Sequence, residues 1–381
     1  MRMGAIEYFR DALESGARAE ELSADRRPVV GTFCNFVPDE VVMAAGAVPV
    51  RLDSGDESAA AEAESAVPKD CCPVARAGVG MLARRAGLHS LAKLLVVPSS
   101  CDAKVKLGAC LESDVPVHVM SLPTGKTGAG SATAWLGEVR RLAERLRELT
   151  GQVVTARALR EAVDITNRRQ AAFRALLELR CASPSRVTGR EVLLVAQASF
   201  TDDPMRLTER LAALVGERQS AAAPPSFGPR VLLTGAPVIY PNMRLVDTIE
   251  SAGASIVADD LCTGTERLYH PVVPMEWSLP ETMRAVAEKT LLPCTCPCFS
   301  GHEDRVNRIL GLVDDCAVQG VVYHNLRTCV LFQFETRHVR EALRKRGAPM
   351  LEVTTDYGGQ DTEQLRTRVE AFTEMLAAGR A

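Results

Sequence analysis

Residues 94–108 read LLVVPSSCDAKVKLG, and this stretch decides the fold. An apolar run typical of a buried strand ends a few residues before Cys101. Residues 321–335, VVYHNLRTCVLFQFE, have the same arrangement before Cys329. In open α/β sheets, ligands collect at the carboxyl ends of parallel strands. The two stretches therefore predict parallel sheets that carry thiols at their ligand-binding edges.

The segments around residues 94–108 extend this pattern through the first third of the chain. Strand-like runs occur at 28–33, 47–52, 94–99 and 115–122. Between them, PDEVVMAAG and ARAGVGMLARRAG have a helical period and end at glycine. This alternation predicts an N-terminal α/β domain over residues 1–130 with a parallel sheet.

The next region is helical in character. Trp135, Val139, Leu142, Leu146 and Leu149 recur at spacings of three and four residues. A second helical pattern follows a candidate N-cap at Thr155, and the proline-rich segment 221–229 closes the region. We expect a helical connecting region over residues 131–228.

Strand and helix patterns alternate again from residue 229 to residue 381, which predicts a C-terminal α/β domain. The last helix is expected to begin at Asp361, where Gln364 follows at capping-box spacing. The fold class is thus α/β, with two flavodoxin-like or Rossmann-like parallel-sheet domains and a helical connection. The strand-like runs of this half are RVLLTGAPVI, SIVADD, GVVYH and PMLEVTTD, and its other helical runs are RLVDTIESAG, DRVNRILGLVDDCA and ETRHVREALRKRG.

Composition narrows the class of protein. The 381 residues carry a net charge of −3. This is near neutral, so the charge does not indicate a nucleic-acid-binding protein. The N-terminal segment is amphipathic and interrupted by charge, and no apolar run of membrane length follows. We therefore expect a cytosolic protein. Its 12 cysteines are then better explained by metal binding or redox chemistry than by disulfides.

Three cysteines are the strongest ligand candidates. Cys72 is preferred over its neighbour Cys71 because the proline after it fixes the backbone near the thiol. Cys101 has Lys104 nearby, and a basic residue favours the thiolate. Cys329 has Arg327 and His324 nearby, which are expected to supply positive charge or hydrogen bonds. Three thiolates can bind three irons of a 4Fe-4S cluster and leave the fourth iron open to substrate.

The remaining cysteines divide into two groups. Cys34, Cys294 and Cys298 are candidates for additional ligands, the last two in the loop CTCPC at 294–298. No second Cys or His pair has the spacing of a zinc ribbon, so the loop either ligates iron or lines the pocket. The second group is expected to pack on helix faces and contains Cys110, Cys181 and Cys316. The stretch GKTGAG (125–130) fails the phosphate-loop pattern.

Long motifs in a fixed order resemble the 2-hydroxyacyl-CoA dehydratase / benzoyl-CoA reductase family, in its cluster-binding component. They are CNFVPDEVVMAAGAVPVRL, VPKDCCPVARAGVG, SSCDAKVKL, PCTCPCF, GVVYHNLRTC and DYGGQDTEQLRTRVEAFTEML. The resemblance implies two flavodoxin-like domains around an iron–sulfur cluster, ligated by Cys72, Cys101 and Cys329. It also implies an acyl-CoA substrate and a separate iron–sulfur ATPase that delivers low-potential electrons.

The same resemblance leaves several properties open. Family members are dehydratase subunits paired with a similar subunit, aromatic-ring reductase subunits, or reductases with an 8Fe-9S double cubane held by six cysteines. A homodimer and a heterodimer are both compatible with the sequence, as is a non-catalytic companion subunit. Thr354 stands where the family usually has a glutamate, so a role for that carboxylate does not transfer to this chain.

Overall fold

The computed structural model describes residues 4–14, 16–111, 115–128, 130–222 and 228–379. Within them, two four-stranded parallel sheets have the same strand order. The first is β2 (Val48–Arg51), β1 (Val29–Thr32), β3 (Ala92–Pro98) and β4 (Val117–Met120). The second is β6 (Ser255–Asp260), β5 (Arg230–Gly235), β7 (Gly320–Leu326) and β8 (Met350–Thr355). In each sheet the order reverses beside the first strand, which is where α/β sheets form ligand crevices.

Helices cover both faces of the first sheet. Along β3, Leu94 and Val96 pack into a core with α3 (Asp39–Ala44), α7 (Ser131–Thr150) and α8 (Ala156–Cys181), whereas Leu95 and Val97 pack into a second core on the opposite face. This alternation follows from the two-residue period of a strand. Because both faces are buried, the central strands are continuous apolar runs, as expected for parallel sheets.

The helices are distributed through the whole described chain and outnumber the strands. Their bounds are α1 Ala5–Glu14, α2 Ala17–Ala24, α3 Asp39–Ala44, α4 Glu57–Glu62, α5 Pro73–Ala83, α6 Asp102–Leu111, α7 Ser131–Thr150, α8 Ala156–Cys181, α9 Gly189–Ala198, α10 Pro204–Ser220, α11 Arg244–Ser251, α12 Thr265–Leu268, α13 Leu279–Leu291, α14 Glu303–Asp315, α15 Val330–Arg346 and α16 Thr362–Ala378.

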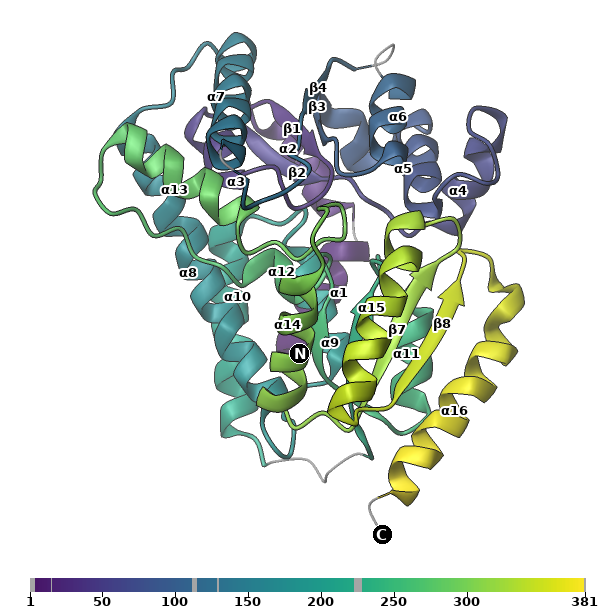
Figure 1. Ribbon diagram of the computed structural model, residues 1–381. Coiled ribbons are helices and arrows are strands. Elements are labelled where there is room, and N and C mark those ends of the chain that lie inside the picture. The colour runs from purple at the N-terminus through teal and green to yellow at the C-terminus, as the bar shows by residue number, and fades with distance from the viewer. Residues whose placement is uncertain (1–3, 15, 112–114, 129, 223–227, 380–381) are drawn as a thin grey trace.

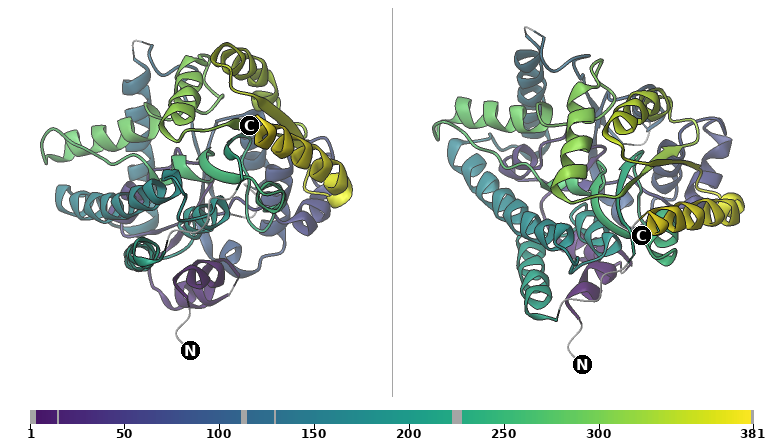
Figure 2. Two further views of the ribbon diagram at one scale, coloured as in Figure 1. Left: turned by 90° about the horizontal axis from the view of Figure 1, so that it is seen from below. Right: turned by 60° about the horizontal axis from the view of Figure 1, so that its bottom comes forward.

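The first sheet and its helices lie at the top of Figure 1, and the second sheet lies below them. Helix α8 connects the two levels, since Arg169 pairs with Asp39 of α3 at 3.1 Å and Arg180 pairs with Asp259 of β6 at 2.5 Å. Helix α16, in yellow, lies at the periphery in both views of Figure 2. No helix in the described ranges is long and apolar enough to cross a membrane.

The two halves approach each other closely at Gly55. A Cβ atom at this position would lie 1.9 Å from the carbonyl oxygen of Ile239, in the loop after β5. No side chain other than hydrogen fits there. The loop after β2 therefore packs directly on the loop after β5, which brings the carboxyl edges of both sheets together.

The eight strands confirm the predicted α/β class, and SIVADD forms β6 over the predicted residues. Thr155 caps α8 as expected, because its hydroxyl accepts from the amide of Ala158 at 3.1 Å. The predicted capping box at Asp361 is not formed, so that prediction was wrong. The Asp361 carboxylate makes no capping hydrogen bond and instead pairs with Arg244 at 2.9 Å.

Other boundaries also differ from the sequence-based expectation. Helix α15 begins at Val330 rather than at Glu335, because it starts directly after Cys329. Helix α13 was not predicted; Pro280 stands in its first turn, where a missing amide hydrogen has no cost. The proline-rich segment expected at 221–229 lies mostly outside the described residues.

Candidate functional site

The three cysteines favoured by sequence all stand at the starts of helices. Cys72 is the N-cap of α5, Cys101 directly precedes α6, and Cys329 is the N-cap of α15. Unpaired amides at a helix start carry partial positive charge and favour a thiolate. The amides that hydrogen-bond these three sulfurs belong to Val74, Ala75, Ala103, Lys104 and Phe332.

The fold brings these three thiols together from both halves. Burial, and after it the nearby Cys72 and Cys101, raise the pKa of Cys329 to about 12. Burial likewise raises the pKa of Cys72 and of Cys101. With no metal bound, the thiols are therefore protonated at neutral pH, so binding of metal must release protons.

A second group of cysteines adjoins the first. Cys34, Cys262 and the loop 294–298 influence one another's ionisation, and the pKa values of Cys262, Cys294 and Cys296 are raised well above the usual range. Burial is the main cause for the first two. For Cys296, the leading cause is its hydrogen bond with Cys298, followed by burial. Cys296 also acts on Cys329, so the two groups are continuous.

This donor set fits an iron–sulfur cluster better than a single ion. Among the described residues, no three His, Cys, Asp or Glu side chains are placed to hold one metal ion. A zinc ion requires its ligands at about 2.0–2.3 Å from one centre. In a four-iron cluster, each thiolate binds a different iron. The buried thiols of Cys72, Cys101 and Cys329 at three helix starts are compatible with thiolates that each bind a different iron.

The backbone is strained beside two of these cysteines. Cys34 has a φ of 70° and Thr328, just before Cys329, has a φ of 66°. Left-handed conformations are uncommon for residues other than glycine and collect at functional sites. The amide of Cys34 donates to Asp53 at 3.0 Å, which holds this residue in place.

A buried charge network lies beside the first cysteine group. Asp53 accepts from Arg51 at 2.7 Å and pairs with Lys104, and Arg51 also donates to the carbonyl of Cys262 at 3.2 Å. Burial alone would raise the pKa of Asp53, but Lys104 and Arg51 hold it far below the usual range. Two cations and one anion leave one net positive charge near Cys34 and Cys101.

A second network fixes the loop 294–298. The amide of Thr295 donates to Glu266 at 2.8 Å. Behind it, Arg305 pairs with Asp260 at 3.0 Å and with Glu335 at 2.6 Å. Arg305 also donates to the carbonyl of Thr295 at 3.4 Å, so the loop is anchored through buried, charge-assisted hydrogen bonds to α12 and, by way of Arg305, to β6 and α15.

His324 does not supply the expected positive charge. Its ring donates from Nδ1 to the carbonyl of Ala236 and accepts at Nε2 from the hydroxyl of Thr355, each at 2.8 Å. Burial lowers the pKa of His324 to about 4, so the ring is neutral at physiological pH. The positive-charge role expected of His324 was therefore wrong. Arg327 lies near the surface and pairs with Asp356 at 3.4 Å.

Lys126, in the glycine-rich stretch 125–130, contacts the start of the loop 294–298. Its ammonium group donates to the carbonyl of Cys294 at 2.6 Å and pairs with Asp304 at 2.6 Å. The lysine thus holds the start of the 294–298 loop. Residue 129 lies outside the described part of the chain.

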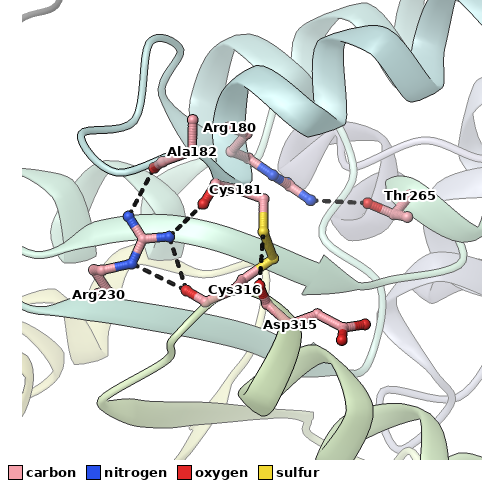
Figure 3. Close-up of a disulfide and its surroundings, with 7 residues drawn as sticks. All are labelled: Arg180, Cys181, Ala182, Arg230, Thr265, Asp315 and Cys316. Atoms are coloured by element: carbon pink, nitrogen blue, oxygen red, sulfur yellow. Dashed lines mark hydrogen bonds between the residues drawn. A yellow bond between two sulfur atoms is a disulfide. The ribbon is translucent and has the colours of Figure 1, made fainter.

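Cys181 and Cys316 pack in a buried cluster, as expected for helix-face cysteines, but nothing in the sequence led us to expect that they form a disulfide. Cys181 and Cys316 form a disulfide between the end of α8 and the residue after α14, with Cα atoms 5.0 Å apart (Figure 3). Their separation of 135 residues left no sign in the sequence. Cys110 is a free and exposed thiol on α6, so the expectation that it packs on a helix face was wrong.

Sequence reasoning missed Cys262. It follows β6 by two residues, at the same sheet edge as Cys329, and its carbonyl accepts from Asn35 at 2.7 Å. The strand-end rule that selected Cys101 applies equally to SIVADD followed by Cys262. That rule was the signal available to find it.

A cavity of about 700 Å³ opens between the two halves. Gly55 and Glu57 line it from the first half, and Arg244, Tyr357 and Arg366 line it from the second. The pKa of Tyr357 is raised well above the usual range by burial and then by Cys72, which places this wall of the cavity beside the first cysteine group.

Comparison with known proteins identifies the family. Residues 34–376 match the family described as 2-hydroxyglutaryl-CoA dehydratase, D-component. The chain is 31% identical over 97% of both chains to the Escherichia coli K12 protein named "Putative dehydratase subunit YjiM". It is 20% identical, again over 97% of both, to the (R)-phenyllactyl-CoA dehydratase beta subunit of Clostridium sporogenes. It is 24% identical over 66% of both to a subunit of the benzoyl-CoA reductase of Thauera aromatica. The chain therefore belongs to the 2-hydroxyglutaryl-CoA dehydratase D-component family.

Proposed function

We propose that this chain is the iron–sulfur subunit of an ATP-dependent radical enzyme that dehydrates a 2-hydroxyacyl-CoA or reduces an acyl-CoA of the benzoyl-CoA type. Cys72, Cys101 and Cys329 bind a 4Fe-4S cluster, and low-potential electrons come from a separate iron–sulfur ATPase. The observation that carries the proposal is the convergence of these three thiols at helix starts. Dehydration is favoured because most of the named relatives are dehydratase subunits.

A bound 4Fe-4S cluster with one open iron supplies a Lewis-acid site and one-electron transfer. The residues of the chain prepare its surroundings. Helix-start amides stabilise all three thiolates in a buried place, and the Lys104 charge stabilises those of Cys72 and Cys101. The Asp53 carboxylate keeps Lys104 protonated, because it raises the pKa of the ammonium against the opposing effect of burial.

The interdomain cavity is the proposed place for the acyl-CoA. Its volume of about 700 Å³ lies within the range of small-molecule sites. Arg244 and Arg366 line the cavity, paired with Asp361 at 2.9 Å and with Glu370 at 3.3 Å. An anionic group of the ligand would compete with these carboxylates for the two guanidinium groups. Tyr357 forms the inner wall towards Cys72, so an acyl group entering from this side would approach the cysteines.

The test is turnover with an ATPase activator of this family. Anaerobically purified protein, the activator, ATP and a panel of 2-hydroxyacyl-CoA thioesters should yield enoyl-CoA. Cys101→Ala should abolish this turnover, and Cys110→Ala, which removes an exposed thiol of the same helix, should retain it. Equal turnover in both variants would instead favour a non-catalytic companion subunit.

A second candidate is a double-cubane reductase of small molecules. The observation that favours it is the second cysteine group, because Cys34, Cys262 and one thiol of the 294–298 loop would bring the ligands to six. A single cubane corresponds to about four irons per chain and a double cubane to about eight. Cys34→Ser and Cys262→Ser should leave the iron content unchanged for a single cubane and lower it for a double one.

A further inference from the structure

The disulfide between Cys181 and Cys316 lies on a frame that does not depend on it. Arg230, the first residue of β5, donates to the carbonyls of Cys181 at 2.6 Å, Ala182 at 2.9 Å and Cys316 at 2.8 Å (Figure 3). One guanidinium therefore holds both chain segments beside each other. The sulfurs stay adjacent when the bond between them is reduced.

The same backbone also accommodates the reduced pair. The sulfur of Cys181 lies 3.5 Å from the carbonyl oxygen of Asp315, which can accept a hydrogen bond from a thiol at that place. The separation of the Cα atoms, 5.0 Å, is within the usual range for a disulfide of about 4.4–6.8 Å. Formation and reduction of the bond thus need no rearrangement of the chain.

Small thiols have access to the pair. A cavity of about 420 Å³ is lined by both cysteines together with Leu177, Leu312 and Arg308. Cys316 is buried, with 6% of its surface exposed, whereas Cys181 is partly exposed. An incoming thiol or disulfide therefore meets the sulfur of Cys181 first.

The pair is connected to the cysteine site through two helices. Arg180, next to Cys181 on α8, donates to Asp259 at 2.5 Å and to Thr265 at 3.0 Å. On α14, which leads to Cys316, Arg308 donates to Asp260 at 2.7 Å. These contacts anchor both ends of segment 259–265, which contains Cys262. The disulfide thus joins the two helices that hold this segment.

We propose that Cys181 and Cys316 form a reversible dithiol–disulfide site, and that the bond stiffens the segment 259–265 at the cysteine centre. With a low-molecular-weight disulfide as oxidant, the Cys181 thiolate attacks one of its sulfurs and one thiol leaves. The Cys316 thiolate then attacks the sulfur of Cys181, the protein disulfide forms and a second thiol leaves. Two electrons and two protons pass from the cysteines to the oxidant.

This site goes beyond the proposed function, and its test does not depend on bound iron. The full-length protein is equilibrated under argon in glutathione buffers of stepped ratio, alkylated, and analysed by mass spectrometry. We expect a single two-electron transition that links Cys181 to Cys316 while Cys110 stays a free thiol. Cys181→Ser and Cys316→Ser should each abolish the linked peptide, and Cys110→Ser should retain it.

Two results would overturn the redox assignment. One is the absence of a linked Cys181–Cys316 peptide in the most oxidising buffer. The other is a link that resists excess dithiothreitol in the folded protein, which would make the bond a permanent cross-link. Both results leave the ligand role of Cys72, Cys101 and Cys329 unaffected, so failure here is distinct from failure of the proposed function.

The stiffening is tested by hydrogen exchange on the same samples. Peptides covering 255–266 should exchange several-fold more slowly in the oxidised protein, and peptides of α16 should be unchanged. Cys181→Ser should exchange at the reduced rate in every buffer. Equal exchange of 255–266 in both redox states would show that the bond does not act on this segment.

Discussion

Asp53 accepts from the side chain of Arg51 at 2.7 Å through the same carboxylate oxygen, Oδ2, that accepts from the amide of Cys34 at 3.0 Å. One oxygen thus fixes a buried cation and a left-handed cysteine. Removing its charge would leave Arg51 and Lys104 without their common partner.

Asp53→Asn should therefore destabilise the protein by about 3–5 kcal/mol, since it breaks a buried ion pair from one side. Urea unfolding of the metal-free protein measures this. Asp25→Asn is the matched control, because Asp25 pairs at 2.7 Å with an Arg27 that is 55% exposed. Such exposed pairs contribute about 1 kcal/mol or less. Equal effects of the two substitutions would contradict the role given to Asp53.

The raised pKa of Cys329 makes the metal-free protein sensitive to alkali. The protonated Cys329 thiol contributes its full stabilisation at pH values below the ordinary pKa of 9.0. This contribution declines as the pH rises towards the folded-state pKa of about 12. Between about pH 8 and about pH 10, the urea midpoint of Cys329→Ser should fall less than that of the wild type. Parallel declines would mean that this thiol ionises as easily in the folded chain as in the unfolded one.

His324 has the opposite dependence. Because burial lowers its pKa from 6.5 to about 4, its contribution to stability is full above pH 6.5 and declines as the pH falls towards 4. His324→Gln should reduce the loss of stability between about pH 7 and about pH 5, even if it lowers stability at neutral pH. An unchanged acid dependence in the variant would show that His324 can bind a proton within the fold.

Helix caps test the local structure independently of the cysteines. Thr188 and Glu191 form a reciprocal capping box at the start of α9, so Thr188→Ala should cost about 1 kcal/mol. Gln364→Ala should change stability by less than about 0.5 kcal/mol, because Asp361 makes no cap hydrogen bond at α16. Thermal unfolding of the two variants gives the comparison. A larger loss of stability in Gln364→Ala would indicate that the capping box at Asp361 does form.

The sequence predicted the features that depend on local pattern. Buried parallel strands such as β3 carry continuous apolar runs, and the strand-end rule located Cys101 and Cys329 just after the carboxyl ends of β3 and β7. Features that depend on partners distant in the sequence were missed. The bond from Cys181 to Cys316 spans 135 residues, and the neutrality of His324 results from burial between Ala236 and Thr355.

The meeting of the three cysteines at one place could be predicted only in part from the sequence. The helix after Cys72 was expected from local sequence, but α15 was expected to begin at Glu335, and the meeting of the three cysteines depends on how the two halves pack at Gly55. Cys262 could have been predicted with the strand-end rule, because it follows β6 by two residues. Local sequence and the resemblance to a family pointed to the same three cysteines, and the fold places their thiols close enough to act on one another electrostatically.

Iron and acid-labile sulfide per chain, measured after strictly anaerobic purification, test the central claim most directly. We predict about four of each for the wild type, a loss of most of the iron in Cys72→Ser, Cys101→Ser and Cys329→Ser, and full retention in Cys110→Ser. Colourless wild-type protein without iron, or a variant with all three cysteines replaced that keeps its iron, would contradict the assignment of these three thiols.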